Sequence, residues 1–362
     1  MLADLATRDG RRVVVLDLFG DLDLRRRGAR VASRPGGSLT ALVDDAVAMA
    51  SGAVVYGASF ENHPLLVGRL AERHALLGNP PETLRAVRNP RRLAAALRDA
   101  GHPVPRTFAT PPPDPSGRWL RKPLRGGGGT RVRGWRGGAL PAGTFVQERI
   151  DGVPCSAAAV ADGTGAAVLG ITEQLVGRRA FGVRGHRWCG NVLPPRLPAA
   201  ERDTLLAQMR AICSSLAGAF SLRGLFGVDV IWDGAHAWTL EVNPRPTASL
   251  EAIEAAHGTA VFDAHLRGCA GELPPTAPQG AGAAGKAVLF ATGDVVVGDS
   301  ERWLARGVRD VPHPGEHIAA GRPVCTVVAT GATPDEVLDA LEAQAAGLRA
   351  ELESPVEVVA GG

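Results

Sequence analysis

The stretch from Phe226 to Pro246 limits the possible folds more than any other part of the sequence. Two runs rich in β-branched and aromatic residues flank an Asp-Gly pair, which predicts a β-hairpin. With the loop centred on Ala235, Asp229 lies directly opposite Glu241. The hairpin is therefore expected to bring two carboxylates together across neighbouring strands.

A third polar side chain is expected beside this pair, because side chains alternate along a strand and Asn243 then shares the face of Glu241. Carboxylate and amide oxygens are hard ligands suited to Mg2+, so Asp229, Glu241 and Asn243 are predicted metal ligands. The alternative is a surface hairpin with a solvated polar face. The apolar residues around Asp229 weigh against it, since a buried acid needs a charged partner. Arg245, between the two prolines that end the strand, is expected beside the acids.

The composition argues against several classes of protein. The chain is 45% hydrophobic and 21% charged, which is typical of a globular enzyme. The net charge is only +3 and no broad basic face with interleaved aromatic residues is visible, so nucleic-acid binding is not expected. Five widely spaced cysteines without a Cys-x-x-Cys pair indicate a reducing compartment and no structural zinc site. Because neither a signal peptide nor a membrane-spanning run is recognised, a cytoplasmic protein without a membrane partner is expected.

The N-terminal part alternates strand-like and helix-like patterns, which predicts parallel strands covered by helices. In such sheets ligands lie beyond the carboxyl ends of the strands. Asp17, Asp21 and Glu61 follow those ends and could bind the ammonium group of a substrate; equally, they could cap helices. The expected elements are a strand that runs into a polar loop at 12–21, strands at 28–32 and 53–57, and helices at 39–51, 64–76 and 80–100.

Lysine is rare in this chain, with only Lys122 and Lys286 among 40 basic residues. Lys122 lies in a strand-like run that enters four consecutive glycines. Backbone N–H groups of such a loop approach an anion closely, and a lysine can reach the same phosphates. The run therefore predicts a phosphate-binding loop, although a flexible hairpin has the same pattern and the P-loop motif is absent. The glycines are Gly126, Gly127, Gly128 and Gly129.

A polar segment at 181–191, interrupted by glycines, contains Arg184, His186 and Asn191. It is interpreted either as a substrate loop or as an ordinary surface loop. The other expected elements are strands at 144–152, 156–160, 166–171, 286–290 and 324–329, a helix at 200–220 and a last helix that begins at a capping box at Thr333.

In this order the elements resemble the ATP-grasp superfamily over about residues 1–270, and Leu-Glu-Val-Asn-Pro-Arg at 240–245 is the most specific motif. The resemblance implies a mixed α/β (α+β ATP-grasp) fold that binds ATP and Mg2+. By that resemblance Lys122 and Arg245 are catalytic: Lys122 holds the ATP phosphates under a flap formed by the four glycines, and Arg245 faces the transferred phosphate. The residues implied around the adenine and its hinge are Gln147, Glu148, Ile150 and Leu240.

The resemblance also implies a domain order. An N-terminal parallel α/β domain at 1–88 precedes a two-part ATP-grasp domain at 89–270, and a linker at 271–284 leads to a small β-rich domain with a terminal helix at 285–362. Within the ATP-grasp domain, the flap subdomain covers about 105–147 and the metal-binding part 148–270. The sequence departs from the family pattern at two places. Arginines at Arg88 and Arg91 stand where many relatives carry a lysine, and Pro154 stands near the place of the acid that often binds ribose.

Within the superfamily the chain looks most similar to the carboxylate–amine ligases found with tetrahydromethanopterin and methanofuran genes, typified by tyramine–glutamate ligase. Three motifs carry this resemblance: Leu-Asp-Leu-Phe-Gly-Asp, Tyr-Gly-Ala-Ser-Phe-Glu and Pro-Val-Cys-Thr-Val. It implies an enzyme that joins glutamate to a tyramine- or tyrosine-like amine of a one-carbon carrier. A homodimer is the candidate assembly, since the C-terminal unit could form either a dimer contact or a wall of the substrate site. A carboxylase-like enzyme that activates bicarbonate and an ATP-binding regulatory protein without turnover are the alternatives.

Overall fold

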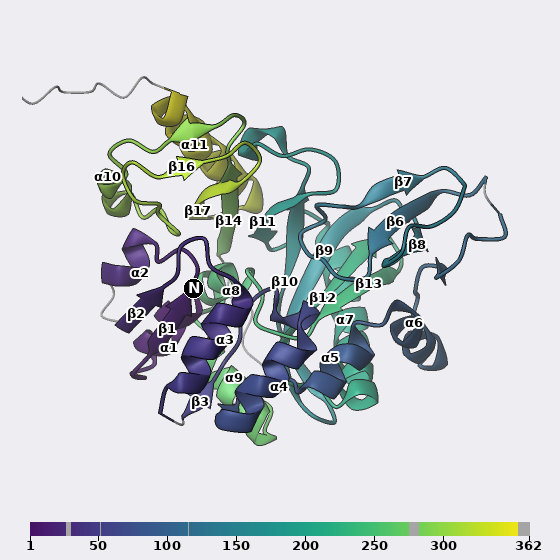
Figure 1. Ribbon diagram of the computed structural model, residues 1–362. Helices are drawn as coiled ribbons and strands as arrows, with labels where there is room; N and C mark the ends of the chain where they lie inside the picture. The colour runs from purple at the N-terminus through teal and green to yellow at the C-terminus, as the bar shows by residue number, and fades with distance from the viewer. Residues whose placement is uncertain (27–29, 51, 115, 275–281, 354–362) are drawn as a thin grey trace, which may run out of the picture.

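The computed structural model describes residues 1–26, 30–50, 52–114, 116–274 and 282–353. A large antiparallel sheet occupies its centre, between an N-terminal α/β region on one side and a smaller sheet on the other (Figure 1). This is the mixed α/β fold that the sequence predicts. Among the described residues, no helix has the length and apolar character needed to cross a membrane.

The large sheet has seven strands in the order β13-β12-β9-β10-β11-β14-β17, and all its neighbours pair antiparallel. Because β14 pairs with β11, the C-terminal strands extend the same sheet. The loop expected at 181–191 is wrong for residues 188–191, which form most of β11 and bond to β10 and β14. The strands are β9 (Val153–Asp162), β10 (Ala166–Val176), β11 (Trp188–Leu193), β12 (Arg223–Trp232), β13 (Ala237–Asn243), β14 (Ala283–Phe290) and β17 (Pro323–Gly331).

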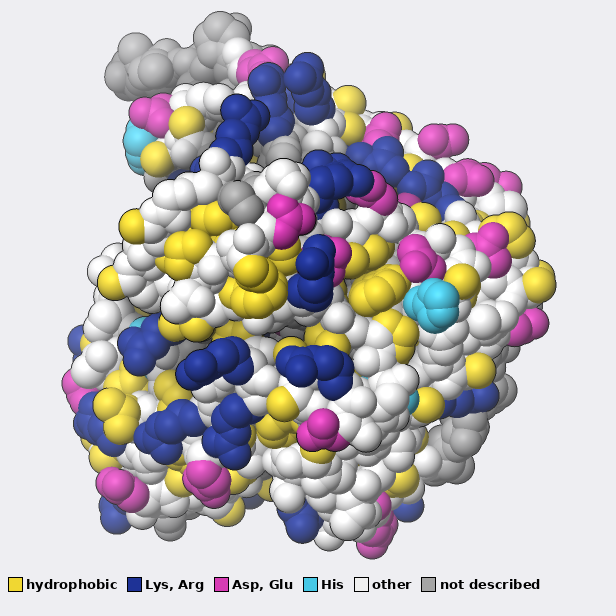
Figure 2. Space-filling model, turned by 90° about the vertical axis from the view of Figure 1, so that its right-hand side faces the viewer, with side chains coloured by type: hydrophobic (Ala, Val, Ile, Leu, Met, Phe, Trp, Pro, Cys, Tyr) yellow, Lys and Arg dark blue, Asp and Glu magenta, His cyan; other side chains and the backbone are white. Residues whose placement is uncertain are grey.

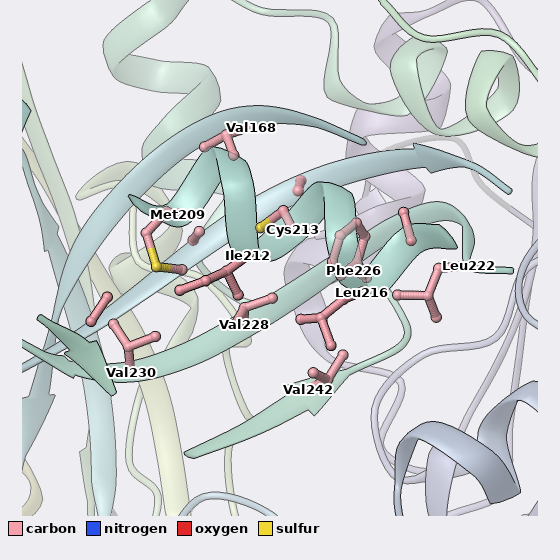
Figure 3. Close-up of a cluster of buried hydrophobic side chains, with 14 of the residues drawn as sticks. Val168, Met209, Ile212, Cys213, Leu216, Leu222, Phe226, Val228, Val230 and Val242 are labelled. Carbon is pink, nitrogen blue, oxygen red and sulfur yellow. The ribbon is translucent and has the colours of Figure 1, made fainter. Parts of the chain in front are cut away.

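Helices cover both faces of this sheet. The predicted helix at 200–220 is confirmed as α7 (Ala199–Phe220), whose apolar residues recur at helical spacing and pack on β9 and β12 (Figure 3). The opposite face packs against α1 (Leu2–Arg8), α8 (Leu250–His257) and α9 (Val261–Ala270). Strand β9 is alanine-rich and buried on both sides, which lets the two helix layers approach closely. The buried residues between α7 and the sheet include Met209, Ile212, Leu216, Phe226, Val228 and Val230.

The N-terminal region contains the three predicted strands, but in two separate small sheets, and the helix predicted at 64–76 ends at Arg73, where residues 75–76 form a further strand. Strand β1 (Val14–Asp17) pairs with β2 (Arg30–Ser33), and β3 (Ala53–Val54) pairs with β4 (Ala75–Leu76). Positions 28–29 and 51 of the predicted elements lie outside the described residues. The helices are α2 (Leu22–Arg26), α3 (Leu39–Ala48) and α4 (Pro64–Arg73), with a short 3-10 turn, η1 (Phe60–Asn62), before α4.

The single helix predicted at 80–100 is wrong: it is divided into α5 (Pro81–Val87) and α6 (Pro90–Asp99). A proline inside a helix lacks the N–H donor and clashes with the preceding turn. Asn89 instead starts a new helix, because its side-chain oxygen accepts from the N–H groups of Arg91 at 3.1 Å and Arg92 at 3.2 Å.

The smaller sheet forms the flap region, with the antiparallel order β5-β8-β6-β7. Its strands are β5 (Thr107–Phe108), β6 (Trp119–Pro123), β7 (Arg133–Trp135) and β8 (Thr144–Glu148). Lys122 lies on β6, and the four glycines occupy the connection from β6 to β7.

The C-terminal region adds β15 (Val295–Val296), β16 (His317–Ile318), α10 (Glu301–Ala305) and α11 (Pro334–Glu353). The predicted N-cap is confirmed, since Glu336 donates its N–H to Thr333 Oγ1 at 3.2 Å, whereas the Glu336 side chain accepts from Ala332 N–H at 3.1 Å, one residue before the expected Thr333. Of the predicted linker, 275–281 lies outside the described residues, and β14 already begins at Ala283. The domain boundaries themselves stay predictions.

Candidate active site at the carboxylate hairpin

The predicted pairing is confirmed at the acids but is wrong next to the turn, where Trp232 pairs with Ala237 instead of Trp238. Strands β12 and β13 pair so that Asp229 is opposite Glu241 and Gly227 is opposite Asn243, with an irregularity just after Asp229. The amide Nδ2 of Asn243 donates to Asp229 Oδ2 at 3.1 Å. The three predicted metal ligands therefore lie on one face of the hairpin, within reach of each other.

Asp229 is held by more partners than the sequence suggests. Its Oδ1 accepts from Ser156 Oγ at 2.7 Å and from Gln174 Nε2 at 3.0 Å. Burial, together with the neighbouring charge of Glu241, raises the pKa of Asp229 to about 7, while the hydrogen bonds of Ser156 and Asn243 and the charge of Arg245 oppose the shift. A buried acid next to a second acid is a position where a cation would be favourable.

Lys122 faces this carboxylate pair from the flap sheet. Its Nζ donates to Gln147 Oε1 at 2.5 Å, and Gln147 Nε2 donates in turn to the carbonyl of Leu240 at 3.3 Å. Burial lowers the pKa of Lys122, while the charges of Glu241 and Asp229 act in the opposite direction. The structure thus brings together Lys122, Gln147 and Leu240, which the family resemblance assigns to one site.

Arg88 is a site residue, although the sequence marks it only as a departure from the family pattern. Its guanidinium lies 3.4 Å from Glu241 Oε2, and it also donates to the carbonyl of Gly126 at 3.0 Å. The Arg88 side chain is only 12% exposed. An arginine thus supplies a cation beside the metal-site acids, at the start of the segment where a lysine is expected.

The glycine loop is docked between the N-terminal region and β11. Gly126 donates its N–H to Asn62 Oδ1 at 3.1 Å, and the carbonyl of Gly128 accepts from Trp188 N–H at 3.1 Å. Gly129 has a φ of +68°, and a Cβ there would lie 1.8 Å from the carbonyl oxygen of His186. Only glycine fits this approach, which brings the loop against the segment of His186.

The predicted hinge lies at the end of β8. Gln147 bonds to Lys122 and to the Leu240 carbonyl. The Glu148 side chain instead forms a two-pronged pair with Arg106, at 3.0 Å for both contacts, which lowers the pKa of Glu148. A role for Glu148 and Ile150 in binding adenine through backbone groups remains a prediction.

The predicted substrate residues do not form one cluster. Glu61, on η1, pairs with Arg245 at 3.2 Å and lies at the main site. Asp17 instead accepts from the N–H groups of Phe19 at 2.8 Å and Gly20 at 2.6 Å, as a turn-capping side chain. Asp21 lies next to the C-terminal region, where burial and the charge of Asp310 raise its pKa to about 7.

The other three candidates belong to the 181–191 segment. Arg184 and His186 are exposed. Partial burial and the charges of Arg149 and Lys122 lower the pKa of His186. Asn191 is buried in β11 and donates to Thr172 Oγ1 at 2.7 Å, which is a contact inside the sheet. Their proposed contact with a substrate remains a prediction.

Two sheets that face each other around a carboxylate hairpin, with a lysine and a glycine loop on the smaller sheet, define the ATP-grasp fold. Residues 87–249 match the family model described as the ATP-grasp domain. This segment is therefore similar to ATP-grasp domains, and the chain has the mixed α/β ATP-grasp fold.

Comparison with curated proteins shows similarity to formate-dependent phosphoribosylglycinamide formyltransferase of Burkholderia cenocepacia (strain HI2424). The two are 33% identical over 162 residues, which cover 42% of this chain and 38% of the relative. The chain therefore spans less than half the length of the curated relatives it matches.

Solved structures with lower identity share the fold over most of the chain. N5-carboxyaminoimidazole ribonucleotide synthetase from Thermus thermophilus superposes with a TM-score of 0.67 at 20% identity, over 98% of this chain and 96% of that one. The biotin carboxylase domain of Hydrogenobacter thermophilus 2-oxoglutarate carboxylase, in complex with MgADP, ADP and bicarbonate, gives a TM-score of 0.69 at 13% identity, over 94% and 85%.

Proposed function

We propose that this chain is an ATP- and Mg2+-dependent ligase that joins a carboxylate to an amine through an acyl phosphate and releases ADP. One observation carries the proposal: Lys122 and Arg88 face the Asp229–Glu241 pair beneath a docked glycine loop. Cations opposite paired acids are the arrangement that phosphoryl transfer needs, because the reaction depends on positioning and on charge neutralisation.

The residues present fit a magnesium ion. Asp229 and Glu241 are directly opposite each other, and the elevated pKa of Asp229 reflects buried negative charge that a cation would offset. Asn243 would add an amide oxygen once its side chain turns its oxygen toward the acids. When bound there, Mg2+ would neutralise charge on the ATP phosphates.

The chemistry divides into two displacements. In the first, an oxygen of the acid forms a bond to the γ-phosphorus of ATP while the bond from that phosphorus to ADP breaks, which leaves an acyl phosphate. In the second, the amine nitrogen forms a bond to the acyl carbon, inorganic phosphate leaves and the nitrogen loses a proton. Lys122, Arg88 and Arg245 stabilise the negative charge of the transferred group, and the glycine loop excludes water from the intermediate.

We propose that the acid is glutamate and that the amine is tyramine- or tyrosine-like, within the biosynthesis of a one-carbon carrier. The support is the resemblance of three motifs, two of which place candidate residues near strand ends in the N-terminal region. Glu61 at the main site would attract an ammonium group, and the exposed Arg184 and His186 would line the approach to it. A homodimer is the proposed assembly.

A second candidate is a carboxylase-like enzyme that activates bicarbonate. Its support is the fold shared with a biotin carboxylase domain that was solved in complex with bicarbonate. The curated relative is named as formate-dependent, which extends the candidate acids to formate. Each of these acids offers an anionic oxygen that ATP could phosphorylate.

The test is ADP release from Mg-ATP with glutamate, formate or bicarbonate, each with and without tyramine or tyrosine, and with products read by mass. A product of glutamate plus the amine minus water supports the specific proposal. ADP release with bicarbonate or formate alone favours the second candidate. ATP binding without turnover on the whole panel would leave a regulatory protein as the explanation.

One variant distinguishes the loss of the metal site from a loss of folding. Glu241→Gln keeps the size and hydrogen-bonding reach of the side chain but removes one predicted metal charge, so turnover should be lost while the unfolding transition stays close to that of the parent. Full activity of Glu241→Gln would exclude the proposed metal site.

A further inference from the structure

The outer face of the flap sheet contains a groove that shares only Leu124 and Arg125 with the pocket around Glu61 and Arg88. The groove has a volume of about 820 Å3. Lys122 points to the inner site, whereas its neighbour Arg121 lines this groove on the opposite face of β6. Its lining, called the outer flap groove below, consists of Arg121, Pro123, Leu124, Arg125, Arg131, Arg133 and residues 141–144.

Two of its arginines are placed in an unfavourable arrangement. Arg121 and Arg133 are direct cross-strand partners in the β6–β7 pairing. Like charges directly opposite each other on neighbouring strands destabilise a sheet. A carboxylate close to the two guanidinium groups would reduce this repulsion, and other arginines of the flap region have such a partner.

The described part of the chain supplies no such acid at the groove. No described carboxylate lies within 4.0 Å of the Arg121, Arg125, Arg131 or Arg133 guanidinium groups. Arg131 and Arg133 donate to backbone carbonyls instead. By contrast, Arg106 pairs with Glu148 and Arg118 pairs with Asp151 in the same subdomain. The groove therefore gathers arginine charge that the described carboxylates do not neutralise.

The groove also has an apolar floor. Leu124 is 42% exposed, and prolines at 123 and 141 and an alanine at 142 lie beside it. Figure 2 views the molecule from the flap side and shows dark blue Lys and Arg side chains around hydrophobic ones in the middle of that face. The lining contains no aromatic residue on which a nucleic-acid base could stack.

We infer that the outer flap groove binds an acidic, extended peptide segment of a partner protein. Guanidinium groups match carboxylates in a two-pronged geometry, and the four arginines would each receive an acid of the segment. An aliphatic side chain of the same segment would cover Leu124. Arg121 and Arg133 lie on the opposite face of the sheet from Lys122, so the inference can be tested at these two residues separately from the proposed ligase activity.

The test uses the full chain and a fluorescently labelled peptide that alternates glutamate with leucine, measured by anisotropy at low and physiological salt. We expect saturable binding that weakens with salt, and about a tenfold loss of affinity in the double variant Arg121→Gln/Arg133→Gln. The control removes the same charge elsewhere, with Arg73→Gln/Arg210→Gln on α4 and α7, and should stay within about twofold of the parent.

Several results would overturn the inference. One is the absence of saturable peptide binding to the parent chain, and another is equal weakening in the control variant. Tighter binding of a single-stranded oligonucleotide of the same charge would assign the groove to nucleic acid. Self-association that disappears in the Arg121→Gln/Arg133→Gln variant would assign it to a second copy of the chain. Circular dichroism of each variant verifies that the flap variant is folded.

Discussion

The buried ion pair between Glu61 and Arg245 joins the N-terminal region to the end of the carboxylate hairpin, and its loss should be costly. Their side chains are 2% and 14% exposed, and Glu61 Oε1 lies 3.2 Å from Arg245 Nη2. At an effective dielectric constant of about 20, two charges at this distance attract by about 5 kcal/mol. Most of this attraction offsets the free energy needed to remove both groups from water, so the net contribution of the pair to stability is small. Removing one partner costs more, because it leaves the other charge buried and unpaired.

The two single substitutions should differ in cost. Glu61→Gln leaves Arg245 with its bond to the Pro246 carbonyl at 2.9 Å and with the nearby charge of Asp229, so we expect a loss of about 3 kcal/mol. Arg245→Gln leaves Glu61 almost fully buried, and the other carboxylate oxygen, Glu61 Oε2, is a buried atom with no hydrogen-bond partner among the described residues. We expect about 4 to 5 kcal/mol for that change.

Urea unfolding followed by tryptophan fluorescence measures these losses, together with the double variant Glu61→Gln/Arg245→Gln. The double variant should lose about 2 to 3 kcal/mol less than the sum of the single variants, because it leaves no unpaired charge. Additive losses, with a coupling energy below about 0.5 kcal/mol, would refute the pairing. The same proteins also test the role of Glu61. If Glu61→Gln changes only the KM of the amine and leaves stability unchanged, Glu61 binds the substrate and does not form a stabilising pair with Arg245.

Three further results are expected. Phe226→Ala should lower the free energy of unfolding by about 3 to 5 kcal/mol, measured with urea, because Phe226 is 1% exposed between α7 and the sheet; a loss below about 1 kcal/mol would contradict that packing. Asn62→Ala should release the glycine loop from its contact with Gly126 and speed tryptic cleavage near the flap several-fold, and an unchanged rate would contradict this docking. Asp21→Asn should raise the free energy of unfolding by about 2 kcal/mol at pH 8 but not at pH 4, as measured by thermal unfolding. The pKa of Asp21 is about 7 in the folded chain, against an ordinary value of 3.8. The folded chain therefore binds an extra proton between these values, and its stability falls as the pH rises through them.

The hairpin can be predicted because all of its determinants are local. Asp229 and Glu241 are separated by one turn, which the Asp-Gly pair marks. The irregularity just after Asp229 shifts the register by one residue and places it opposite Glu241. The same locality explains why the sequence also predicts α7 and the N-cap of α11. Such features depend on residues a few positions apart, so tertiary packing does not change them.

The other partners of the acids cannot be found in this way. Ser156 and Gln174 reach Asp229 from β9 and β10, and that contact depends on the strand order of the sheet. Arg88 reaches Glu241 across 153 positions. A sequence pattern shows which residue types are present but not which of them meet in the folded chain. The sequence therefore marks Arg88 only as an arginine at a place where related proteins carry a lysine. The error at 181–191 has a related cause, because polar and glycine residues in β11 are stabilised by pairing with β14, nearly a hundred positions later.

Two adjacent residues on η1 contact two different parts of the site, so the position of this turn affects both parts. Glu61 contacts Arg245 across 184 positions, while Asn62 contacts Gly126 across 64. A three-residue turn cannot move one of these side chains without moving the other, so the position of the N-terminal region sets both the arginine at the hairpin end and the base of the glycine loop. Neither residue belongs to the segment 87–249 that matches the ATP-grasp domain. The carboxylate hairpin and Lys122 can be placed by that segment alone, whereas the loop and the orientation of Arg245 require the N-terminal region as well.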